Sequence, residues 1–300
     1  MRVFVAGGTG IIGRRAVAAL IEAGHEVTAL SRRPESDASL RSVGATPVRV
    51  GLFDGDGLRA VLPGHAAVVN IATAIPPLSE AMKPSAWEMN NRIRREGAPT
   101  LATAAVASGV GRFVQESVSF DYLDGGDAWI DETYQRDIKL AGPAEEAERA
   151  AREFPGDGIV LRFAQFFSHD SDHVGSFARY WRWHVSPLLG QSEGYISFVH
   201  ADDAAAAVVA ALQAPPDTYN IAESQPARRQ DLDDSVASIL GHRLTLRVPS
   251  GLTRRISPDA EPIMRSHRIS NRHFSDATGW APTQPSANSL LPTIVKELLK

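Results

Sequence analysis

Short apolar runs alternate with segments of helical spacing through the first half of the chain. The apolar runs predict strands at residues 2–6, 26–30, 47–50, 67–72, 112–116 and 158–162. Between them, apolar residues recur at helical intervals and predict helices over residues 14–20 and 58–62 and from about 85 to 108, the last interrupted near Gly97 and Pro99. Alternating strands and helices build an α/β fold, here a doubly wound parallel sheet of the Rossmann type.

The pattern changes after residue 165, where a small C-terminal lobe is expected to begin. Residues 195–200 and 218–222 again predict strands, and residues 202–212 predict a helix that Asp202 would cap. We therefore predict a Rossmann domain over residues 1–165, to which residues from about 195 to 222 return. The lobe is expected to comprise residues 166–194 and 223–300.

The first predicted strand ends in a glycine turn, residues 7–13 (GGTGIIG), that leads directly into a helix. The first two glycines of this signature permit a tight turn and a close approach of backbone to a pyrophosphate, and the third lets the helix pack against the strand. The free N–H groups at the start of the helix then face the phosphates. We expect a dinucleotide to be bound here by Gly7, Thr9, Gly10, Ile11, Ile12 and Gly13.

The second predicted strand ends in Ser31, Arg32 and Arg33, where an NAD site would carry an Asp or Glu for the ribose hydroxyls. Guanidinium groups instead suit a 2′-phosphate, because they donate paired hydrogen bonds to its oxygens. The alternative is that both arginines are solvated loop charges. The sequence therefore favours NADP(H) over NAD(H), with these three residues at the adenosine end and Ala72 and Thr73 over the cofactor at the end of the fourth strand.

The composition argues against nucleic-acid binding, cysteine chemistry and insertion into a membrane. The 300 residues carry a formal net charge of −4, which gives no electrostatic footprint for nucleic-acid binding. Cysteine is absent, which excludes disulfides and thiolate chemistry. No apolar run is long enough to span a bilayer, and the chain opens in a strand without a basic leader. We therefore expect a cytoplasmic protein with no membrane partner.

His169 and His173 are four residues apart with carboxylates between them, a spacing that on a helix would align both imidazoles toward a metal ion. No third ligand is evident, so we predict no metal site. A polar loop that leads into a helix capped by Asp172 is the plainer interpretation, and contact with a substrate is the other. The aromatic residues that follow, from Phe177 to Trp183, would either line an apolar pocket or pack against the sheet.

Further motifs follow in a fixed order along the chain. They are Asn70-Ile71-Ala72, Glu116-Ser117-Val118-Ser119, Phe198-Val199-His200-Ala201-Asp202-Asp203, Tyr219-Asn220-Ile221 and Gly279-Trp280-x-Pro282. With the glycine turn, they resemble the NAD-dependent epimerase/dehydratase group of extended short-chain dehydrogenases/reductases over almost the whole chain. The resemblance implies a Rossmann domain, a small substrate lobe and a small-molecule substrate, with structural roles for His200 and Asp202. The resemblance is also compatible with a homodimer.

The chain departs from this family at the acid/base pair. Family members that oxidise or reduce a carbinol use a Tyr and a Lys four residues later on one helix, and no tyrosine here has a lysine at that spacing. The corresponding helix is expected to begin near Gly142-Pro143, with Leu140 and Ala144 aligned to the Tyr and Lys positions. Tyr134 and Lys139 are five residues apart and would point about 140° apart on a helix, although a loop would let them converge.

Proton transfer is therefore expected from residues that follow the fifth strand. Ser117 or Ser119 would donate to a substrate oxygen at the carboxyl edge of the sheet, where open α/β sheets bind ligands. Glu116 and Tyr122 would transfer protons if burial moves their pKa values toward the working pH.

Two function classes follow. The first is an atypical NADP(H)-dependent oxidoreductase or epimerase/dehydratase-like enzyme that acts on a small oxygenated molecule. The second is a non-redox protein, either a dinucleotide-binding sensor or a lyase or cyclase on the same scaffold. The intact glycine turn favours retained nucleotide binding, and the missing Tyr–Lys pair counts against ordinary carbinol chemistry.

Overall fold

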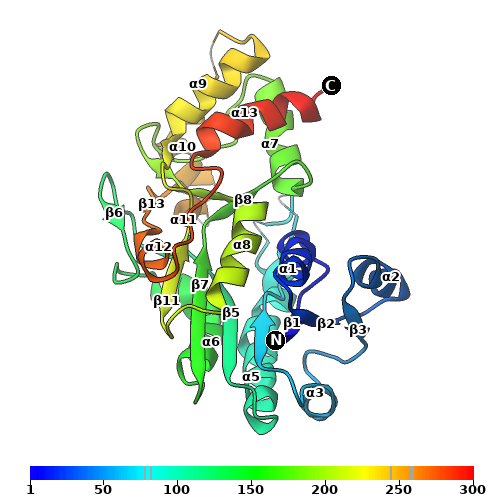
Figure 1. Cartoon of the computed structure of the whole chain (residues 1–300). Helices are drawn as coiled ribbons and strands as arrows, with labels where there is room; N and C mark the ends of the chain where they lie inside the picture. Colours follow the sequence, from blue (N-terminus) through cyan, green and yellow to red (C-terminus); the bar gives the residue numbers. More distant parts are fainter. Residues whose placement is uncertain (78, 82, 244, 257–259) are drawn as a thin grey trace.

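The computed structural model describes residues 1–77, 79–81, 83–243, 245–256 and 260–300. Its centre is a seven-stranded sheet of order β3-β2-β1-β4-β5-β7-β11, in which every neighbouring pair is parallel (Figure 1). The strand order reverses between β1 and β4, and in open α/β sheets this is where ligands bind. The predicted Rossmann sheet is confirmed.

The strands of this sheet agree closely with the apolar runs of the sequence. They are β1 (Arg2–Ala6), β2 (Glu26–Leu30), β3 (Thr46–Val48), β4 (Ala67–Asn70), β5 (Arg112–Val118), β7 (Asp157–Phe163) and β11 (Thr218–Ile221). The helices packed around them are α1 (Ile11–Glu22), α2 (Pro34–Ser42), α3 (Gly55–Val61), α4 (Glu88–Arg92), α5 (Ala98–Ala107), α6 (Ile138–Arg152) and α8 (Ala201–Ala211).

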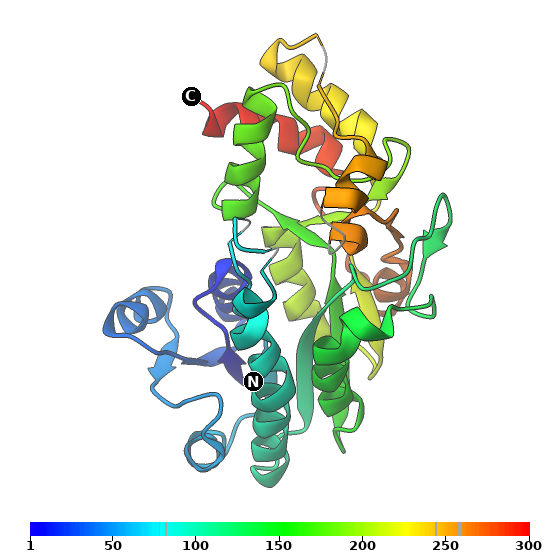
Figure 2. The same cartoon turned by 180° about the vertical axis from the view of Figure 1, so that it is seen from behind.

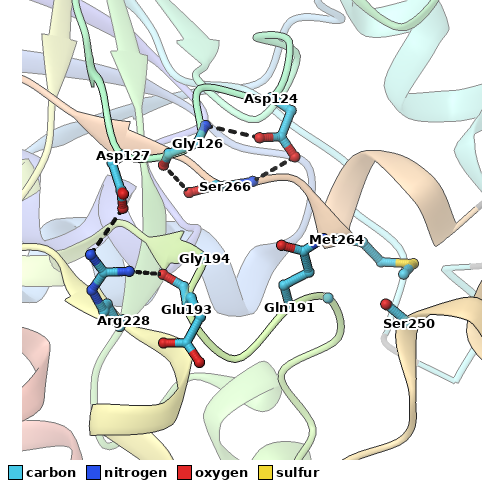
Figure 3. Close-up of a pocket in the computed structure, with 11 residues that line it drawn as sticks. Asp124, Gly126, Asp127, Gln191, Glu193, Gly194, Arg228, Ser250, Met264 and Ser266 are labelled. Carbon is cyan, nitrogen blue, oxygen red and sulfur yellow. Dashed lines mark hydrogen bonds and ion pairs between the residues drawn. The ribbon is translucent and has the colours of Figure 1, made fainter.

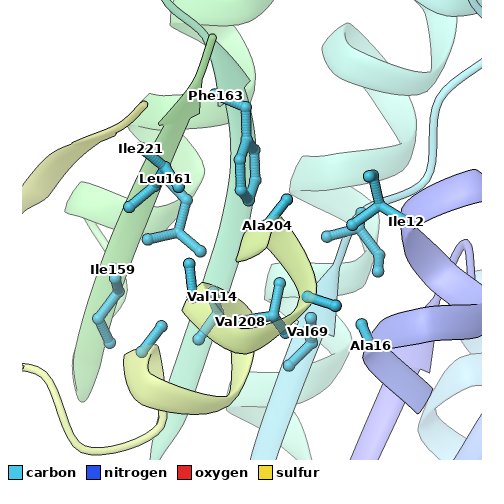
Figure 4. Close-up of a cluster of buried hydrophobic side chains, with 14 of the residues drawn as sticks. Ile12, Ala16, Val69, Val114, Ile159, Leu161, Phe163, Ala204, Val208 and Ile221 are labelled. Carbon is cyan, nitrogen blue, oxygen red and sulfur yellow. The ribbon is translucent and has the colours of Figure 1, made fainter. Parts of the chain in front are cut away.

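Each face of the sheet has its own apolar core, because successive side chains of a strand point to opposite faces. On one face Val114 and Leu161 pack toward Ala204 and Val208 of α8, with α1 beside them (Figure 4). On the other, side chains such as Phe113 pack against α3 and α5. Since both faces are buried, the strands appear in the sequence as continuous apolar runs rather than alternating ones.

The C-terminal lobe has a third core, formed where α7 (Asp172–Arg182), α9 (Arg229–Leu240) and α13 (Ala287–Leu298) pack together (Figure 2). Phe177 and Trp181 are buried in it, and the Trp181 indole N–H donates to Asp233 at 2.8 Å. Tyr180 and Trp183 lie exposed on the opposite side. The buried part of the aromatic stretch therefore packs within the core of the lobe.

Short elements complete the lobe and its connections to the sheet. They are β6 (Trp129–Ile130), β8 (Gln165–Phe167), β9 (Tyr195–Ile196), β10 (Phe198–His200), β12 (Ala227–Arg228), β13 (Arg268–Ile269), α10 (Ser250–Ile256), α11 (Glu261–Met264) and α12 (Arg272–Thr278). Across the described part of the chain, no helix combines the length and apolarity that crossing a bilayer requires.

Two helix predictions near the middle of the chain have different outcomes. The helix expected to begin near Gly142-Pro143 begins earlier, at Ile138, because the Asp137 carboxylate accepts hydrogen bonds from the N–H groups of Lys139 and Leu140. Pro143 lies inside the helix. The predicted interruption of the long helix near Gly97 is confirmed: a π-helical turn, η2 (Ile93–Gly97), separates α4 from α5.

Two capping predictions are wrong. The N-cap of α8 is His200, whose Nδ1 accepts from the Asp202 N–H at 3.4 Å, while the Asp202 carboxylate binds the Arg15 guanidinium at 2.7 Å. The N-cap of α7 is Ser171, and Asp172 lies within the first helical turn. In both places an acidic side chain stands one or two positions beyond the cap, where it still favours the positive end of the helix.

Asp203 connects α8 to the last segment of the chain. One carboxylate oxygen accepts from the N–H and hydroxyl groups of Thr283 at 2.8 and 2.6 Å, and the other accepts from the Gln284 N–H at 3.0 Å. The Trp280 indole donates to the Asp203 carbonyl at 3.2 Å. This buried carboxylate therefore holds the closing segment against the sheet domain.

We predict that Asp203→Ala lowers the free energy of unfolding by roughly 2–4 kcal/mol, because buried donors left unpaired cost about 1–3 kcal/mol each. Urea unfolding followed by circular dichroism measures this value. The control is Asp217→Ala, which removes an exposed carboxylate paired with His273 and should cost less than about 1 kcal/mol. Equal losses in the two variants would contradict the role of Asp203.

Candidate functional site

The turn between β1 and α1 is built by direct backbone contact. Gly7 has a φ of +90°, and a Cβ there would lie 2.5 Å from the Ile71 carbonyl oxygen and 2.6 Å from the Ala72 nitrogen. A Cβ at Gly13 would lie 2.0 Å from the Gly7 carbonyl oxygen. No side chain fits at either position, so α1 packs directly against the turn after β1, and this turn packs directly against the end of β4.

The first turn of α1 presents unused backbone donors. Its N-cap, Gly10, has no side chain to cap the helix, and no acidic residue stands in the first turn. The N–H groups of Ile11, Ile12 and Gly13 donate to no group within the described residues. The Ile12 side chain is buried in the core, so its backbone alone faces outward. Free N–H groups at the positive end of a helix form an anion site that suits a pyrophosphate.

The predicted cofactor residues at the end of β4 lie beside this turn. Ala72 and Thr73 are half-buried, and Ala72 reaches the backbone of Gly7. Asn70 fixes this strand end, because its side chain donates to Gln115 at 2.8 Å and accepts from the Ala72 N–H at 3.4 Å. Thr9 lies exposed in the turn itself. The structure thus brings together the residues predicted for the pyrophosphate and the strand end above it.

The end of β2 forms a basic tip. Ser31 is buried, and its hydroxyl donates to the Arg33 carbonyl at 3.1 Å. Arg32 and Arg33 are exposed, and neither forms an ion pair with any described residue. Of the two acids in the first turn of α2, Glu35 is exposed, whereas Asp37 is buried and binds the Arg49 guanidinium at 2.6 Å, which lowers the pKa of Asp37. The basic tip therefore offers guanidinium groups rather than a carboxylate.

Three residues predicted for proton transfer are buried and bonded: Glu116 and Ser117 lie within β5, which runs to Val118, and Tyr122 follows it. The Ser117 hydroxyl donates to Glu148 Oε1 at 2.6 Å, and Glu116 pairs with Arg94 at 3.0 Å. The Tyr122 hydroxyl donates to Asn220 at 2.9 Å, and burial raises the pKa of Tyr122 to about 12. Each oxygen therefore already has a partner inside the protein.

Glu148 is the centre of this buried network, and sequence reasoning did not identify it as a site residue. Arg162 binds both its oxygens at 2.8 and 3.0 Å and also donates to the Tyr122 hydroxyl at 2.8 Å. Arg136 binds Glu148 at 3.0 Å. Burial alone would raise the pKa of Glu148, but these guanidinium groups and the Ser117 hydroxyl outweigh it and lower the pKa. Glu148 therefore stays ionised.

No Tyr–Lys pair is assembled on α6. Leu140 and Ala144, at the aligned positions, are apolar, and Glu148 lies one turn further along the helix. Tyr134 lies before the helix, where its hydroxyl donates to the Asp124 carbonyl at 3.2 Å, and Lys139 is exposed in the first turn. No contact between Tyr134 and Lys139 is present among the described residues, so the loop does not make them converge.

The histidine pair lies at the start of α7, with His169 before the helix and His173 in its first turn. His169 pairs with Glu297 at 3.4 Å, whereas burial lowers the pKa of His173. Within the described ranges, no group of three His, Cys, Asp or Glu side chains is placed to hold a metal ion. Asp170, between the histidines, binds Arg14 and Arg15 of α1. This segment therefore connects the lobe to the helix of the dinucleotide site.

Comparison with known proteins agrees with this geometry. A 3-diazoavenalumate denitrifying reductase from a Streptomyces species is 30% identical and aligns with 95% of this chain and 97% of its own. The crystal structure of the human epimerase family protein SDR39U1 with NADPH has a TM-score of 0.79 and 24% identity, with 99% of both chains covered. A dTDP-glucose 4,6-dehydratase from Streptomyces venezuelae, with NAD bound, has a TM-score of 0.77 and 19% identity, with 98% and 96% covered.

The family model described as the NAD dependent epimerase/dehydratase family matches residues 3–222. This span contains the glycine turn, α6 and, apart from Arg2 at the start of β1, every strand of the sheet. The full-length relative named as a reductase extends the similarity through the C-terminal lobe. The chain therefore belongs to the NAD dependent epimerase/dehydratase family and is an NAD(P)-binding oxidoreductase of the short-chain dehydrogenase/reductase type.

Proposed function

We propose that this protein is an NADP(H)-dependent reductase and that its substrate is a small, electron-poor organic molecule. The enzyme would act without a Tyr–Lys pair. The observation that carries the cofactor choice is the basic tip of Arg32 and Arg33, which stands exposed at the end of β2 with no acid bound to it. Guanidinium groups at this end of the site would hold the 2′-phosphate of NADP(H). The human relative crystallised with NADPH supports the same choice, while NAD in another neighbour leaves it to be tested.

The residues present fit the bound dinucleotide. The free N–H groups of Ile11, Ile12 and Gly13 would hold its pyrophosphate, and Ala72 and Thr73 would lie beside it at the end of β4. When bound, the nicotinamide ring supplies the hydride.

The apolar residues at the two aligned positions of α6 favour reduction over carbinol oxidation. Oxidation of an alcohol needs a base for the hydroxyl proton, and Leu140 and Ala144 supply none. An electron-poor acceptor takes up a hydride before any proton is needed. The full-length relative acts as a reductase on a diazo compound, an acceptor of this kind. Since that relative is a reductase, the non-redox sensor, lyase or cyclase alternative is not favoured.

We propose positioning roles for the three residues expected to transfer protons. Ser117 and Tyr122 are bonded into the Glu148–Arg162 network, and Glu116 is bonded to Arg94. Each would hold the end of β5 in place beneath the substrate. Ser119 is the better candidate for contact with a substrate, since its hydroxyl has no bonded partner among the described residues.

The location of the protein in the cytoplasm and its assembly into a homodimer stay predictions.

Gly13→Ala should weaken NADPH binding at least tenfold, because the new methyl would lie 2.0 Å from the Gly7 carbonyl oxygen and push α1 off the turn. Titration calorimetry measures the affinity, and circular dichroism reports the fold. Gly142→Ala on α6 is the control, because a Cβ there meets nothing within 4 Å. Unchanged binding by the Gly13 variant would mean that the turn does not contact the dinucleotide.

The cofactor choice predicts that NADPH binds more tightly than NADH. Arg32→Ala and Arg33→Ala should together weaken NADPH binding by roughly 1.5–3 kcal/mol, the typical contribution of hydrogen bonds to charged groups, and leave NADH unchanged. The matched control is Arg41→Ala, an exposed arginine at the far end of α2. Titration calorimetry with NADPH and with NADH measures both affinities in each variant. Equal affinities in the wild type, or equal losses for both nucleotides in the variant, would overturn the NADP(H) assignment.

The positioning roles predict a loss of stability without a loss of chemistry. Ser117→Ala and Tyr122→Phe should each lower the free energy of unfolding by about 1–3 kcal/mol, because buried partners lose their hydrogen bonds. Reduction of an arenediazonium salt, followed by NADPH consumption, should stay within about tenfold of wild type. Tyr180→Phe, at an exposed tyrosine of α7, controls for the substitution. A 10²–10⁴-fold fall in kcat with unchanged stability would instead assign these residues to proton transfer.

A further inference from the structure

Accessible positive charge is concentrated at the end of the lobe that lies away from the sheet, where α7 and α9 both end (Figure 1). Arg179 and Arg182 occupy the last turn of α7, and Arg243 follows the end of α9. All three residues are exposed. No carboxylate of the described residues pairs with any of them. We call residues 179–184, 242–243 and 245–248 the outer face of the lobe.

The segments that form the outer face contain no acid. Residues 173–192 and 235–258 include no Asp or Glu, although the whole chain has a formal net charge of −4. The positive charge of this face is therefore not balanced within its own segments, and it would attract an anionic partner.

The pocket of the lobe has the opposite charge. It lies between the loop that follows β5 and the segments that lead into β9 and β13 (Figure 3). Its charged lining comprises the carboxylates of Asp124, Asp127 and Glu193 and the guanidinium of Arg228, which pairs with Asp127 at 2.9 Å. Charge is thus segregated within the lobe, and the outer face rather than the pocket suits an anion.

Large apolar side chains stand among the arginines of the outer face. Trp183, at the end of α7, is 76% exposed, and Leu246 is 61% exposed. Val248 is also exposed, whereas Arg247 between it and Leu246 turns inward and pairs with Asp233. Apolar side chains that cluster in an exposed patch with a polar rim are typical of an interaction surface.

The two segments of the outer face lie side by side. The His184 carbonyl accepts from the Leu246 N–H at 2.7 Å, and the Leu246 carbonyl accepts from the Ser186 N–H at 2.8 Å. The imidazole rings of His184 and His242 stack with their centroids 3.7 Å apart. Trp183 and Leu246 therefore belong to one surface, although they are far apart in the sequence.

Helix stability explains only part of this surface. Arginines in the last turn of α7 interact favourably with the negative end of the helix dipole. That interaction gives no reason for Trp183 and Leu246 to remain in water, where each exposes apolar area that burial would stabilise. The surface as a whole suits a partner that is anionic outside and apolar beneath.

We propose that the outer face binds the surface of a lipid bilayer with anionic headgroups. The guanidinium groups would bind headgroup phosphates and carboxylates, and tryptophan is enriched at the level of the headgroups. Leu246 and Val248 would enter the apolar layer beneath them. A nucleic acid would also attract the arginines, but it offers no apolar layer to these two side chains.

The sequence predicts no membrane partner because it lacks a long apolar run. That argument concerns a segment that spans a bilayer. It does not concern a surface that folding assembles from two distant segments, each of which is short and contains arginines. The proposal therefore replaces the sequence-based expectation with contact at one side of a membrane.

Sedimentation of the whole protein with lipid vesicles provides the test. Phosphatidylcholine vesicles with about 30% phosphatidylserine should bind the protein at least tenfold more tightly than pure phosphatidylcholine vesicles, and sodium chloride at about 0.5 M should remove most of this difference. No nucleotide or substrate is needed, so the result is independent of the proposed reductase. No binding to the anionic vesicles, or equal binding to both kinds, would overturn the proposal.

Charge variants examine the arginines. Arg179→Gln together with Arg182→Gln should weaken binding to anionic vesicles by roughly 25-fold, because each basic residue near such a surface contributes about fivefold. The matched control is Arg41→Gln together with Arg272→Gln, two exposed arginines of α2 and α12, which should bind like the wild type. Circular dichroism verifies that both double variants are folded. Equal binding by the two double variants would refute the role of the arginines.

Tryptophan fluorescence reports the apolar part of the contact. Phosphatidylcholine with brominated acyl chains, mixed into the anionic vesicles, quenches tryptophans that enter the bilayer. Quenching should occur in the wild type and in Trp129→Phe, which removes an exposed tryptophan of β6, but should be largely lost in Trp183→Phe. Unchanged quenching in Trp183→Phe, or no quenching in the wild type, would contradict insertion of the outer face.

A single-stranded oligonucleotide separates lipid from nucleic acid, because it offers phosphates without an apolar layer. Leu246→Ser should weaken vesicle binding about tenfold, since it removes buried apolar area. Oligonucleotide binding without vesicle binding, or vesicle binding that Leu246→Ser leaves unchanged, would overturn the assignment of this face to a bilayer.

Discussion

The contact between the Gly13 Cα and the Gly7 carbonyl is the constraint on which the rest of the structure depends. It allows α1 to pack directly against the turn after β1, so that the helix N-terminus faces the carboxyl edge of the sheet. The same helix carries Arg14 and Arg15, which bind Asp170 at the start of the lobe, and Arg15 also binds Asp202 of α8. The position of α1 therefore fixes the free N–H groups at its start and anchors the first segment of the lobe.

The second constraint is electrostatic. In this chain the helix expected to carry a Tyr–Lys pair instead presents Leu140 and Ala144, and one turn later the buried Glu148. Glu148 draws Arg162, Arg136 and the Ser117 hydroxyl into one network. Breaking one partner of such a network leaves an uncompensated buried charge, which is strongly destabilising. These buried charges therefore hold the end of β5 in place.

The fold could be predicted from the sequence because buried parallel strands leave continuous apolar runs. The glycine turn could also be predicted, because the close backbone contacts at these positions leave no room for a side chain. The partners of charged residues could not be predicted. Glu148 and Arg162 are fourteen residues apart on different elements. The caps at Asp137 and His200 were missed for a simpler reason: several polar residues stand near each helix start, and local geometry decides which one bonds.

The most direct test of the central claim is a single-turnover experiment with NADPH that carries deuterium at C4 of its nicotinamide ring. The protein is mixed with this nucleotide and an electron-poor acceptor, and the product is examined by mass spectrometry. Our account predicts deuterium in the product, formed at a rate that does not follow the titration of a tyrosine or lysine. A product without deuterium, or no product while NADPH stays bound, would contradict hydride transfer by this protein.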